Sequence, residues 1–523
     1  MNYNLKILDK FKEVFNIFLI FLTSFIFNIY YGSIGVFPID TFAFFDSANL
    51  INKGFLPIRD YWTSNGFFVD ILQSFFFKIL GVNWYSYLIH SSLINFIFAA
   101  LTYKFLKSEG LAKSAALFYS LSVAILFYPP VGVPFPDHHS IIFSLISIYF
   151  FIFSIKTRSK LYLFITIFSL SIAFLCKQVP AVFFLILIGS YLIYFSFKKK
   201  DKSFLIYIFV FSFSLIVAFI LFLLITRIGI KDFYIQYISF PSSIGTERSN
   251  LFKIQSILLS LINEFKFISI FTLIIFFQLI NLKKKNNHEE KNFSATIFLF
   301  VSIILIFNQE LMKNQNIVFF ILPILIGIIH NLIIDSKKEK INFFVLLLIV
   351  FNIFVTLKYH ERFNENRKFM DFRNINKSNF VDASEITTKL KGLRWITSKY
   401  SSRLMYEVDQ LKKSITFLKA NKERSIIITY YQFINSAIDH NIYPPNRWYT
   451  SDGVSYPIKG NKDYENYIKF FKKKLIEKNV NRIYTIDPLD KNTFDFVFKA
   501  DCVETQKINE ILSQHLITNC FAN

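Results

Sequence analysis

Two aspartates stand where short turns meet long apolar runs. Asp40 comes just after the apolar stretch 14–36, and Asp137 comes just before the stretch 138–155. Carboxylates at such a boundary are costly to desolvate unless they are wet, paired or functional. If their loops share one side, both acids can act on one hydroxyl group, one removing its proton while the other orients it or holds a divalent cation. Each can equally cap the helix that follows it, residues 41–52 in the case of Asp40.

Two basic residues are placed where they can bind a phosphate group. Lys177 follows the apolar run 161–176, and Arg248 lies in the long loop 228–265. A lysine binds phosphate as a point charge, and an arginine can hold it through two parallel hydrogen bonds. Alternatively, Lys177 snorkels to the membrane interface and Arg248 pairs with Glu247 or a lipid headgroup.

Other polar residues at the ends of apolar runs are weaker candidates. Glu310 ends the sequence Asn308-Gln-Glu310 and can line a sugar pocket, or belong to an ordinary short loop. His138 and His139 follow Asp137, and a metal site is the less favoured reading because adjacent histidines rarely chelate one ion together.

The composition indicates a polytopic membrane protein. Of the 523 residues, 53% are hydrophobic and only 18% are charged, which leaves too little polar surface for soluble domains. The net charge of +22 comes from short basic clusters between apolar runs, so it does not indicate a nucleic-acid partner. Runs of a length that can span a bilayer number about eleven. They are residues 14–36, 85–103, 114–130, 138–155, 161–176, 179–197, 203–226, 266–282, 293–310, 316–334 and 341–357.

Lysine and arginine alternate between the loops in a way that predicts the orientation. The basic segments are residues 1–13, 104–113, 156–160, 198–202, 283–291 and 337–340. Because cytoplasmic loops carry the excess of basic residues, the amino terminus is expected in the cytoplasm. An odd number of spans then places the carboxyl terminus outside. The apolar segment Phe67–Leu80 would invert every later loop if it crossed the membrane, so we expect a helix in the outer interface.

The composition changes near Lys358 to a mixture of charged and apolar residues. We therefore expect a transmembrane domain over residues 1–357 and an extracytoplasmic α/β domain over residues 358–523. Helical spacing covers 384–421 and 463–478. Short buried strands are predicted at Ser425–Tyr430 and Arg482–Ile486, with no glycine-rich phosphate loop after either of them.

The first outer loop resembles that of the C-type integral-membrane glycosyltransferases. The resemblance rests first on an acid, Asp40, followed by an alanine eight residues later, Ala48, and a glycine fourteen residues later, Gly54. A Pro-x-Arg-Asp motif follows as Pro57-Ile-Arg59-Asp60. An amphipathic helix, Phe67–Leu80, and a Leu-Gly-x-Asn motif, Leu80-Gly-Val-Asn83, complete the pattern. It covers roughly residues 1–350 and is strongest to the bacterial branch near protein O-mannosyltransferases and lipid A aminoarabinose transferases.

The resemblance assigns roles to these residues. It makes Asp40 the catalytic base, with Asp46 as a substitute because many members have Asp-Glu where this chain has Asp40-Thr41. It makes Asp137 the second acid. In the shared motif, Asp60 becomes a further catalytic candidate and Arg59 a ligand for the donor phosphate. Alternatively, Asp60 and Arg59 only pair with each other at the surface.

The same resemblance supports Lys177 as a donor-phosphate ligand, and Arg248 remains a phosphate ligand by the chemistry of its side chain. Similar Lys-Gln pairs occur at the position of Lys177-Gln178 in related enzymes. Gln178, His138 and Glu310 are then candidates for substrate binding, and no metal ligand is assigned.

The implied reaction moves a sugar from a polyprenyl-phosphate donor to a cell-envelope glycan, lipid or protein on the outer face, with inversion at the anomeric carbon. The expected location is a bacterial inner membrane, with lipopolysaccharide among the possible acceptors. No cofactor is required, although a divalent cation can assist. The alternative function is a flippase or transporter of lipid-linked glycans, or a glycan polymerase, which would use the same outer residues. Transporters usually have repeated halves and helices broken near the midplane, and neither feature is evident in the sequence.

Overall fold

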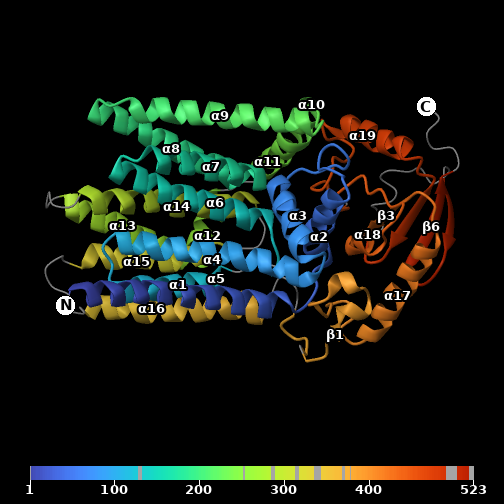
Figure 1. Cartoon of the computed structure of the whole chain (residues 1–523), viewed down its shortest axis with the longest axis horizontal. Coiled ribbons are helices and arrows are strands. Elements are labelled where there is room, and N and C mark those ends of the chain that lie inside the picture. Colours follow the sequence, from blue (N-terminus) through green and yellow to red (C-terminus); the bar gives the residue numbers. More distant parts are fainter. Residues whose placement is uncertain are drawn as a thin grey trace.

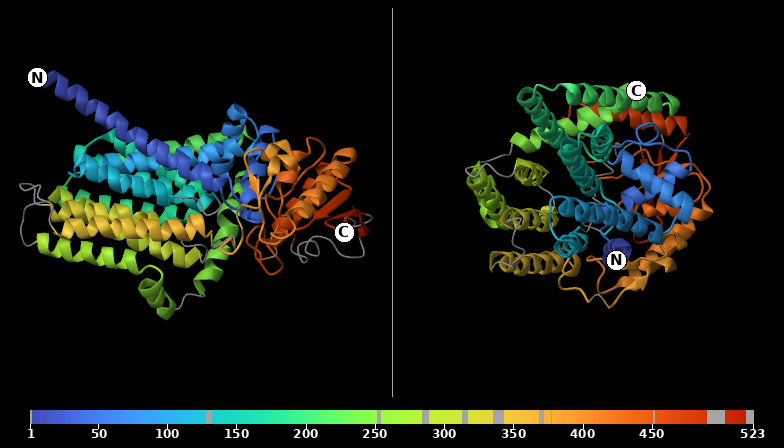
Figure 2. Two further views of the ribbon diagram at one scale, coloured as in Figure 1. Left: turned by 90° about the horizontal axis from the view of Figure 1, so that it is seen from below. Right: turned by 60° about the vertical axis from the view of Figure 1, so that its left-hand side comes forward.

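The structure is a computed structural model of the chain, and it describes residues 2–127, 132–250, 254–283, 289–312, 317–334, 343–367, 372–376, 378–450, 452–489 and 503–517. A bundle of long helices occupies one end of the molecule and a smaller region with a β-sheet occupies the other (Figure 1). The views in Figure 2 show the amino terminus at the free end of the bundle, with the first outer loop between the bundle and the carboxyl-terminal region.

The helices of the bundle correspond to the apolar runs of the sequence. In chain order they are α1 (Asn2–Gly32), α4 (Trp84–Ser108), α5 (Lys113–Leu126), α6 (Pro136–Thr157), α7 (Lys160–Cys176), α8 (Gln178–Lys199), α9 (Ser203–Ile225), α13 (Lys266–Lys283), α14 (Glu289–Met312), α15 (Ile321–Ile333) and α16 (Phe343–His360). Each run therefore contains one helix, as the hydrophobic pattern predicts.

Not all of these helices are long enough to cross a bilayer. Within the described residues, seven pass by length and apolarity, and an eighth candidate joins α12 (Ile254–Asn263) to α13 across a 90° bend. The shorter apolar helices are α5, α7 and the segment Val318–Ile333, which contains α15. The expected number of about eleven spans is thus reduced to seven or eight that meet the length requirement. Almost all of α15 is buried, so protein surrounds it, and a helix enclosed by protein does not need the full bilayer thickness.

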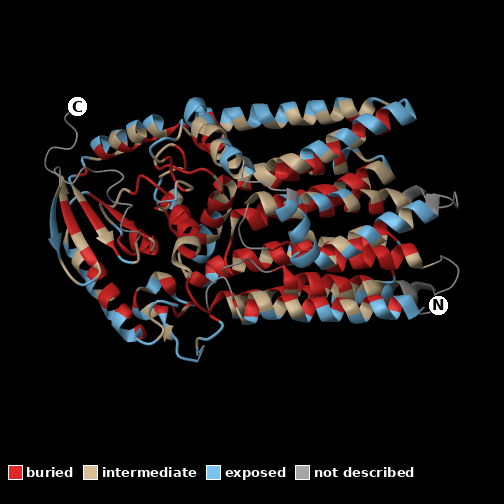
Figure 3. Ribbon diagram, turned by 180° about the vertical axis from the view of Figure 1, so that it is seen from behind, coloured by how far each residue is buried: buried red, intermediate tan, exposed pale blue. Residues whose placement is uncertain are grey.

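Burial separates the centre of the bundle from its lipid-facing side (Figure 3). In α9 only Phe204 and Leu223 are buried, although the helix is almost entirely apolar. In α6 most side chains from Pro136 to Ser154 are buried against α7 and α8. An apolar helix that stays exposed in the folded chain is expected to face lipid. The basic segments at 284–288 and 337–340 lie outside the described residues.

Several short helices cover the end of the bundle that meets the carboxyl-terminal region. They are α2 (Pro38–Asn52) and α3 (Phe67–Leu80) from the first outer loop, and α10 (Ile230–Phe233), the π-helical turn η1 (Tyr234–Ser239) and α11 (Phe240–Asn250). The helix predicted at 67–80 is confirmed as α3. Its polar residues Asp70 and Gln73 point into the protein, whereas Lys78 is exposed.

The carboxyl-terminal region contains a four-stranded mixed sheet in the order β3-β4-β6-β5. The strands are β3 (Ser425–Thr429), β4 (Arg482–Ile486), β5 (Val503–Lys507) and β6 (Leu512–Ile517), and only the β3–β4 pair is parallel. The predictions of β3 and β4 are confirmed. Helices α17 (Leu404–Ala420), α18 (Phe433–Ala437) and α19 (Tyr464–Glu477) accompany the sheet.

The long helix predicted over 384–421 is wrong in its first half, where only α17 is α-helical. Residues before it form short 3-10 turns and the small strands β1 (Val381–Asp382) and β2 (Arg394–Trp395). The reason is a tertiary pairing: the amides of Gly35 and Val36, just after α1, donate to the carbonyls of Arg394 and Ile396 at 3.0 and 2.9 Å. This backbone pairing ties the carboxyl-terminal region to the end of the first helix.

Candidate functional site

Four charged side chains from four separate elements meet at this end of the bundle. They are Asp40 in the first turn of α2, Asp137 in the first turn of α6, Lys177 between α7 and α8, and Arg248 near the end of α11. The charge of Asp40 is influenced by Asp137 and Lys177, and that of Lys177 by Asp137, Arg248 and Asp40. We call these four residues the charged cluster. Two carboxylates and two cations in one place can handle a proton and bind an anion at the same time.

An ion pair between Lys177 and Asp137 lies at the centre of the charged cluster. The Lys177 Nζ and Asp137 Oδ1 atoms are 2.6 Å apart, and the two side chains are only 13% and 9% exposed. Lys177 has extended backbone between two helices, and the hydroxyl of Ser140 in α6 donates to its carbonyl at 2.9 Å. Burial lowers the pKa of Lys177, while the neighbouring carboxylates of Asp137 and Asp40 oppose that shift.

Asp40 is half-buried and has no hydrogen-bond partner among the described residues. Burial, and next the negative charge of Asp137, raise its pKa to about 7, against the opposing charge of Lys177. The helix begins at Pro38, so Asp40 lies inside its first turn and is not the N-cap. A carboxylate with a pKa near neutrality and no bonded partner is suited to accepting a proton.

Arg248 lies on the α11–α14 side of the charged cluster, and Glu310 lies at the end of α14 that Arg248 contacts. The guanidinium of Arg248 contacts the sulfur of Met312 at 3.9 Å, at the end of α14. Glu310 lies two residues earlier in the same last turn of α14. The described residues thus place both side chains at the same end of the bundle as Lys177.

The remaining acids of the first outer loop have partners elsewhere. Asp46 is buried and accepts hydrogen bonds from Asn435 Nδ2 at 2.9 Å and Ser436 Oγ at 2.7 Å, both in α18. Burial raises the pKa of Asp46 to about 6, and those two hydrogen bonds oppose the shift. Asp60 accepts from Arg59 Nε at 2.9 Å and from the amide of Leu56 at 2.7 Å.

Arg59 also closes a turn of this loop. It donates to the carbonyls of Thr226 and Gly54 at 3.0 and 2.8 Å. Asp46, Asp60 and Arg59 therefore hold the loop together, and their bonded partners do not include any member of the charged cluster.

Gln178 and His138 stand beside the charged cluster in supporting positions. The side-chain amide of Gln178 donates to the carbonyls of Ser64 and Tyr237 at 3.0 and 2.5 Å, which joins three loops. His138 is buried, and its ring stacks on Phe127 with the ring centres 4.1 Å apart. Within the described residues, no group of three or more His, Cys, Asp or Glu side chains is arranged to hold a metal ion.

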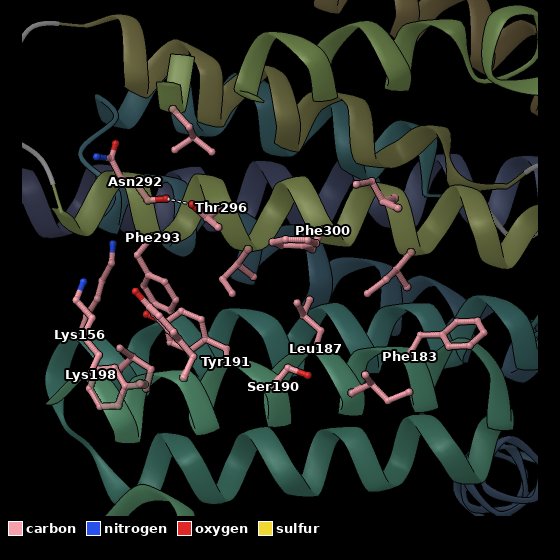
Figure 4. Close-up of a pocket in the computed structure, with 18 of the residues that line it drawn as sticks. Lys156, Phe183, Leu187, Ser190, Tyr191, Lys198, Asn292, Phe293, Thr296 and Phe300 are labelled. Atoms are coloured by element: carbon pink, nitrogen blue, oxygen red, sulfur yellow. Dashed lines mark hydrogen bonds between the residues drawn. The ribbon is translucent and has the colours of Figure 1, made fainter. Parts of the chain in front are cut away.

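A long apolar groove runs along the bundle between α8 and α14 (Figure 4). Its volume is about 1100 Å³, and Leu187, Tyr191 and Phe300 are among its walls. Lys156 and Lys198 lie at one end of the groove in Figure 4, with Phe183 toward the other. At that other end the rings of Phe183 and Phe307 contact each other, with their centres 5.3 Å apart. Phe183 is five residues after Gln178 on α8, and Phe307 is five residues before Met312 on α14. The groove therefore ends close to the charged cluster.

Sequence reasoning did not identify one buried pair beside these residues. Arg447, from the carboxyl-terminal region, forms an ion pair with Asp70 of α3, and the two side chains are 1% and 0% exposed. The two residues are 377 positions apart in the chain. A polar residue in an apolar segment is a signal that Asp70 needs a partner, but no local pattern singles out Arg447 as that partner.

Part of the chain matches a known protein family. Residues 64–225 match the family described as dolichyl-phosphate-mannose-protein mannosyltransferase. The matched segment contains Asp137 and Lys177 and ends with α9, while Asp40 and Arg248 lie outside it. No curated protein matches the sequence.

Proposed function

We propose that this chain is a membrane glycosyltransferase of the family described as dolichyl-phosphate-mannose-protein mannosyltransferase, and that it transfers its sugar at the charged cluster. The family match over residues 64–225 supports this proposal and, with it, a lipid-phosphate sugar as donor, although the motif residues from Asp40 to Asp60 precede the matched segment. The acceptor in this proposal is a cell-envelope glycan, lipid or protein on the outer face of the membrane.

The observation that carries the proposal is the convergence of Asp40, Asp137, Lys177 and Arg248. A transferase of this kind needs a base for the acceptor hydroxyl and cations for the phosphate that leaves. Both kinds of group come from separate elements, and Lys177 contacts Asp137 directly.

The proposed reaction is a direct displacement. The acceptor oxygen attacks the anomeric carbon, its proton passes to Asp40, and the bond from that carbon to the phosphate oxygen breaks. Polyprenyl phosphate leaves with the electron pair, and Lys177 and Arg248 stabilise its charge. Asp137 holds the Lys177 ammonium in place. Attack from the face opposite the leaving group inverts the anomeric configuration.

The groove between α8 and α14 supports a lipid-linked donor. Its volume of about 1100 Å³ exceeds the about 300–1,000 Å³ of ordinary small-molecule pockets, and most of its lining is apolar. Ile186 and Phe300 in its walls are 59% and 47% exposed, so the groove opens sideways toward lipid. In this proposal the polyprenyl chain lies in the groove while its phosphate reaches Lys177.

The proposed topology adds the shorter helices α5, α7 and α15 to the eight candidates of sufficient length, which gives eleven crossings. The amino terminus is then in the cytoplasm, and residues 358–523 form an extracytoplasmic domain. All four members of the charged cluster then face the outer side. A bacterial inner membrane, with lipopolysaccharide among the acceptors, is the setting in which we propose that the enzyme works.

Substitution of Asp40 tests the proposal in cells. Mass spectrometry of envelope glycans and of polyprenyl-phosphate sugars compares wild type, Asp40→Asn and the control Glu13→Gln, whose carboxylate pairs with Lys107 at the opposite end of the bundle. Loss of one sugar from the glycans with accumulation of its lipid-linked form, in Asp40→Asn alone, supports transfer at Asp40. Unchanged profiles in Asp40→Asn at normal expression contradict it and favour a transporter.

Filling the groove tests the placement of the lipid. Ser190→Trp puts a large ring into the groove, whereas Ile193→Trp puts the same ring on the same helix at a 51% exposed residue outside the lining. The KM for the donor is expected to rise about tenfold or more in Ser190→Trp only, because each lost contact of about 1.4 kcal/mol is a factor of ten. Equal KM values in the two variants contradict this placement.

A further inference from the structure

The side chain of Arg447 joins the carboxyl-terminal region to the first outer loop inside the protein. Its guanidinium forms the buried ion pair with Asp70 of α3 and also donates to the carbonyl of Asn65. The same group lies over the ring of Phe44 in α2, 4.8 Å from the ring centre. A planar guanidinium has five donors in a fixed arrangement, so it can hold two acceptors and a ring at once.

Backbone hydrogen bonds reinforce this junction. The amide of Trp62 donates to the carbonyl of Pro445 at 2.7 Å, and the amide of Arg447 donates to the carbonyl of Trp62 at 3.1 Å. Residues 62–66 are therefore fixed to residues 445–447 by backbone as well as by the Arg447 side chain.

The turn Ser64–Gly66 in turn holds the chain on both sides of Lys177. The amide of Gly66 donates to the carbonyl of Cys176 at 2.7 Å, and Gln178 Nε2 donates to the carbonyl of Ser64 at 3.0 Å. Lys177 lies between these two attachments, with its ammonium on Asp137. The position of the ammonium therefore depends on where the turn lies.

Gly66 shows how closely the turn is packed. It has a φ of +70°, and a Cβ added there would lie 2.5 Å from a carbon of Phe44, 3.0 Å from Arg447 Nη1 and 3.1 Å from Pro136, next to Asp137. The turn therefore packs directly against α2, the start of α6 and the Arg447 side chain, with no space for a side chain at residue 66.

We propose that Arg447 is a positioning residue for Lys177, so that the carboxyl-terminal region completes the site that binds the donor phosphate. Arg447 acts through the Ser64–Gly66 turn and does not itself touch the substrate. The inference rests on the proposed role of Lys177 in binding the donor phosphate.

Kinetics of the full-length enzyme test the inference. The variants are Arg447→Lys and Arg447→Met, and the readouts are kcat and the KM for a polyprenyl-phosphate sugar. Arg447→Met is expected to raise the donor KM and lower kcat/KM by about 10- to 100-fold, because a small displacement of a binding group has an effect of that size. Arg447→Lys keeps the charge near Asp70 but cannot hold Asn65 at the same time, so an intermediate value is expected.

Glu407→Gln is the matched control for a general loss of stability. Glu407 is a buried carboxylate of α17 that accepts from Trp395 Nε1 at 2.9 Å and Thr397 Oγ1 at 2.8 Å, away from the Ser64–Gly66 turn. Its substitution is expected to lower the melting temperature without changing the donor KM. A donor KM that changes equally in Glu407→Gln and in both Arg447 variants overturns the inference.

The double variant Arg447→Met with Lys177→Met identifies the route of the effect. If Arg447 acts through Lys177, the double variant is no worse than Lys177→Met alone. Multiplication of the two single effects shows an independent role and overturns the inference. If Lys177→Met alone leaves the donor KM unchanged, the proposed phosphate site fails first, and the inference about Arg447 fails with it.

Discussion

The two ends of the helix bundle use their charges differently. At the amino-terminal end, every charge named here has an oppositely charged partner on another segment: Lys107 pairs with Glu13, Lys156 with Glu109 at 2.7 Å, and Arg158 with Asp201 at 3.1 Å. Each of these pairs connects segments that are far apart in the sequence. Charges paired in this way stabilise the packing of the helices, and few of these charged groups remain available to bind a ligand.

At the opposite end of the bundle, the described acidic and basic side chains are not all paired with each other. Asp40 and Asp137 both lie near Lys177, but only Asp137 contacts it directly. Asp40 has no hydrogen bond among the described residues, although Asp46, six residues later on α2, has two from α18. The surrounding loops are held by the carboxyl-terminal region through Asp46 and Asp70, so Asp40 can remain uncompensated without loosening the fold. This difference supports the proposal that a ligand binds at the end that holds the charged cluster.

The largest difference in transfer rate is expected between two variants that each lose one paired carboxylate, one at each end of the bundle. Asp137→Asn leaves Lys177 without its closest partner beside the reacting groups, and transfer is expected to fall at least about 100-fold. Glu109→Gln removes the partner of Lys156 and is expected to lower stability while leaving transfer per folded molecule nearly unchanged. Initial rates of sugar transfer by the purified variants, corrected for folded protein, test this. Equal losses at both ends would remove the distinction.

Removal of one cation at each end gives the next largest effect. Lys177→Met is expected to raise the donor KM about 10- to 100-fold, because a hydrogen bond to a charged group contributes about 1.5–3 kcal/mol. Lys107→Met is expected to leave the donor KM as in wild type, since its partner is Glu13. Titration of transfer against donor concentration gives both values, and a wild-type KM in Lys177→Met would contradict the account.

The pH dependence distinguishes Asp40 from the paired acids. A base must be ionised to accept a proton, and the pKa of Asp40 is raised to about 7. We therefore expect kcat/KM to increase with pH up to about 7 and then level off. Because the charge of Asp137 raises this pKa, the residual activity of Asp137→Asn is expected to reach its plateau at lower pH. A profile without a break between pH values of about 5 and 8 would show that Asp40 does not titrate in the rate-determining step.

The smallest effect on transfer is expected at Asp46. Asp46→Asn keeps the size of the side chain and one acceptor oxygen but places an NH2 group opposite one of the two donors, which costs about 1–3 kcal/mol of stability. Thermal unfolding should therefore begin at lower temperature, while the transfer rate at permissive temperature changes less than about threefold. A loss as large as that of Asp40→Asn would instead favour Asp46 as the acid that takes the proton.

The sequence predicted the elements that depend on local pattern. Long apolar runs became the bundle helices α1, α4 to α9 and α13 to α16, and the short segment Phe67–Leu80 became α3, because hydrophobic length and period act locally. Asp40, Asp137, Lys177 and Arg248 could be assigned to one side of the membrane because successive helices reverse direction. Strands β5 and β6 were not predicted, since most of β5 is exposed and carries little apolar pattern.

What the sequence could not supply are contacts between distant segments. The ion pair between Asp70 and Arg447 spans 377 residues, and neither partner belongs to a local motif that would identify the other. The same holds for Asp46, whose partners in α18 explain its burial only once the chain is folded. A single sequence indicates that a buried polar group needs a partner without indicating which one.

The central claim is that Asp40 takes the acceptor proton at the charged cluster, and single-turnover transfer tests it most directly. Purified enzyme in lipid nanodiscs is mixed with a polyprenyl-phosphate sugar and acceptor, and release of polyprenyl phosphate is followed for wild type and Asp40→Asn. The account predicts that the variant binds the donor normally but transfers the sugar about 10²- to 10⁴-fold more slowly. Transfer at the wild-type rate by Asp40→Asn would contradict it.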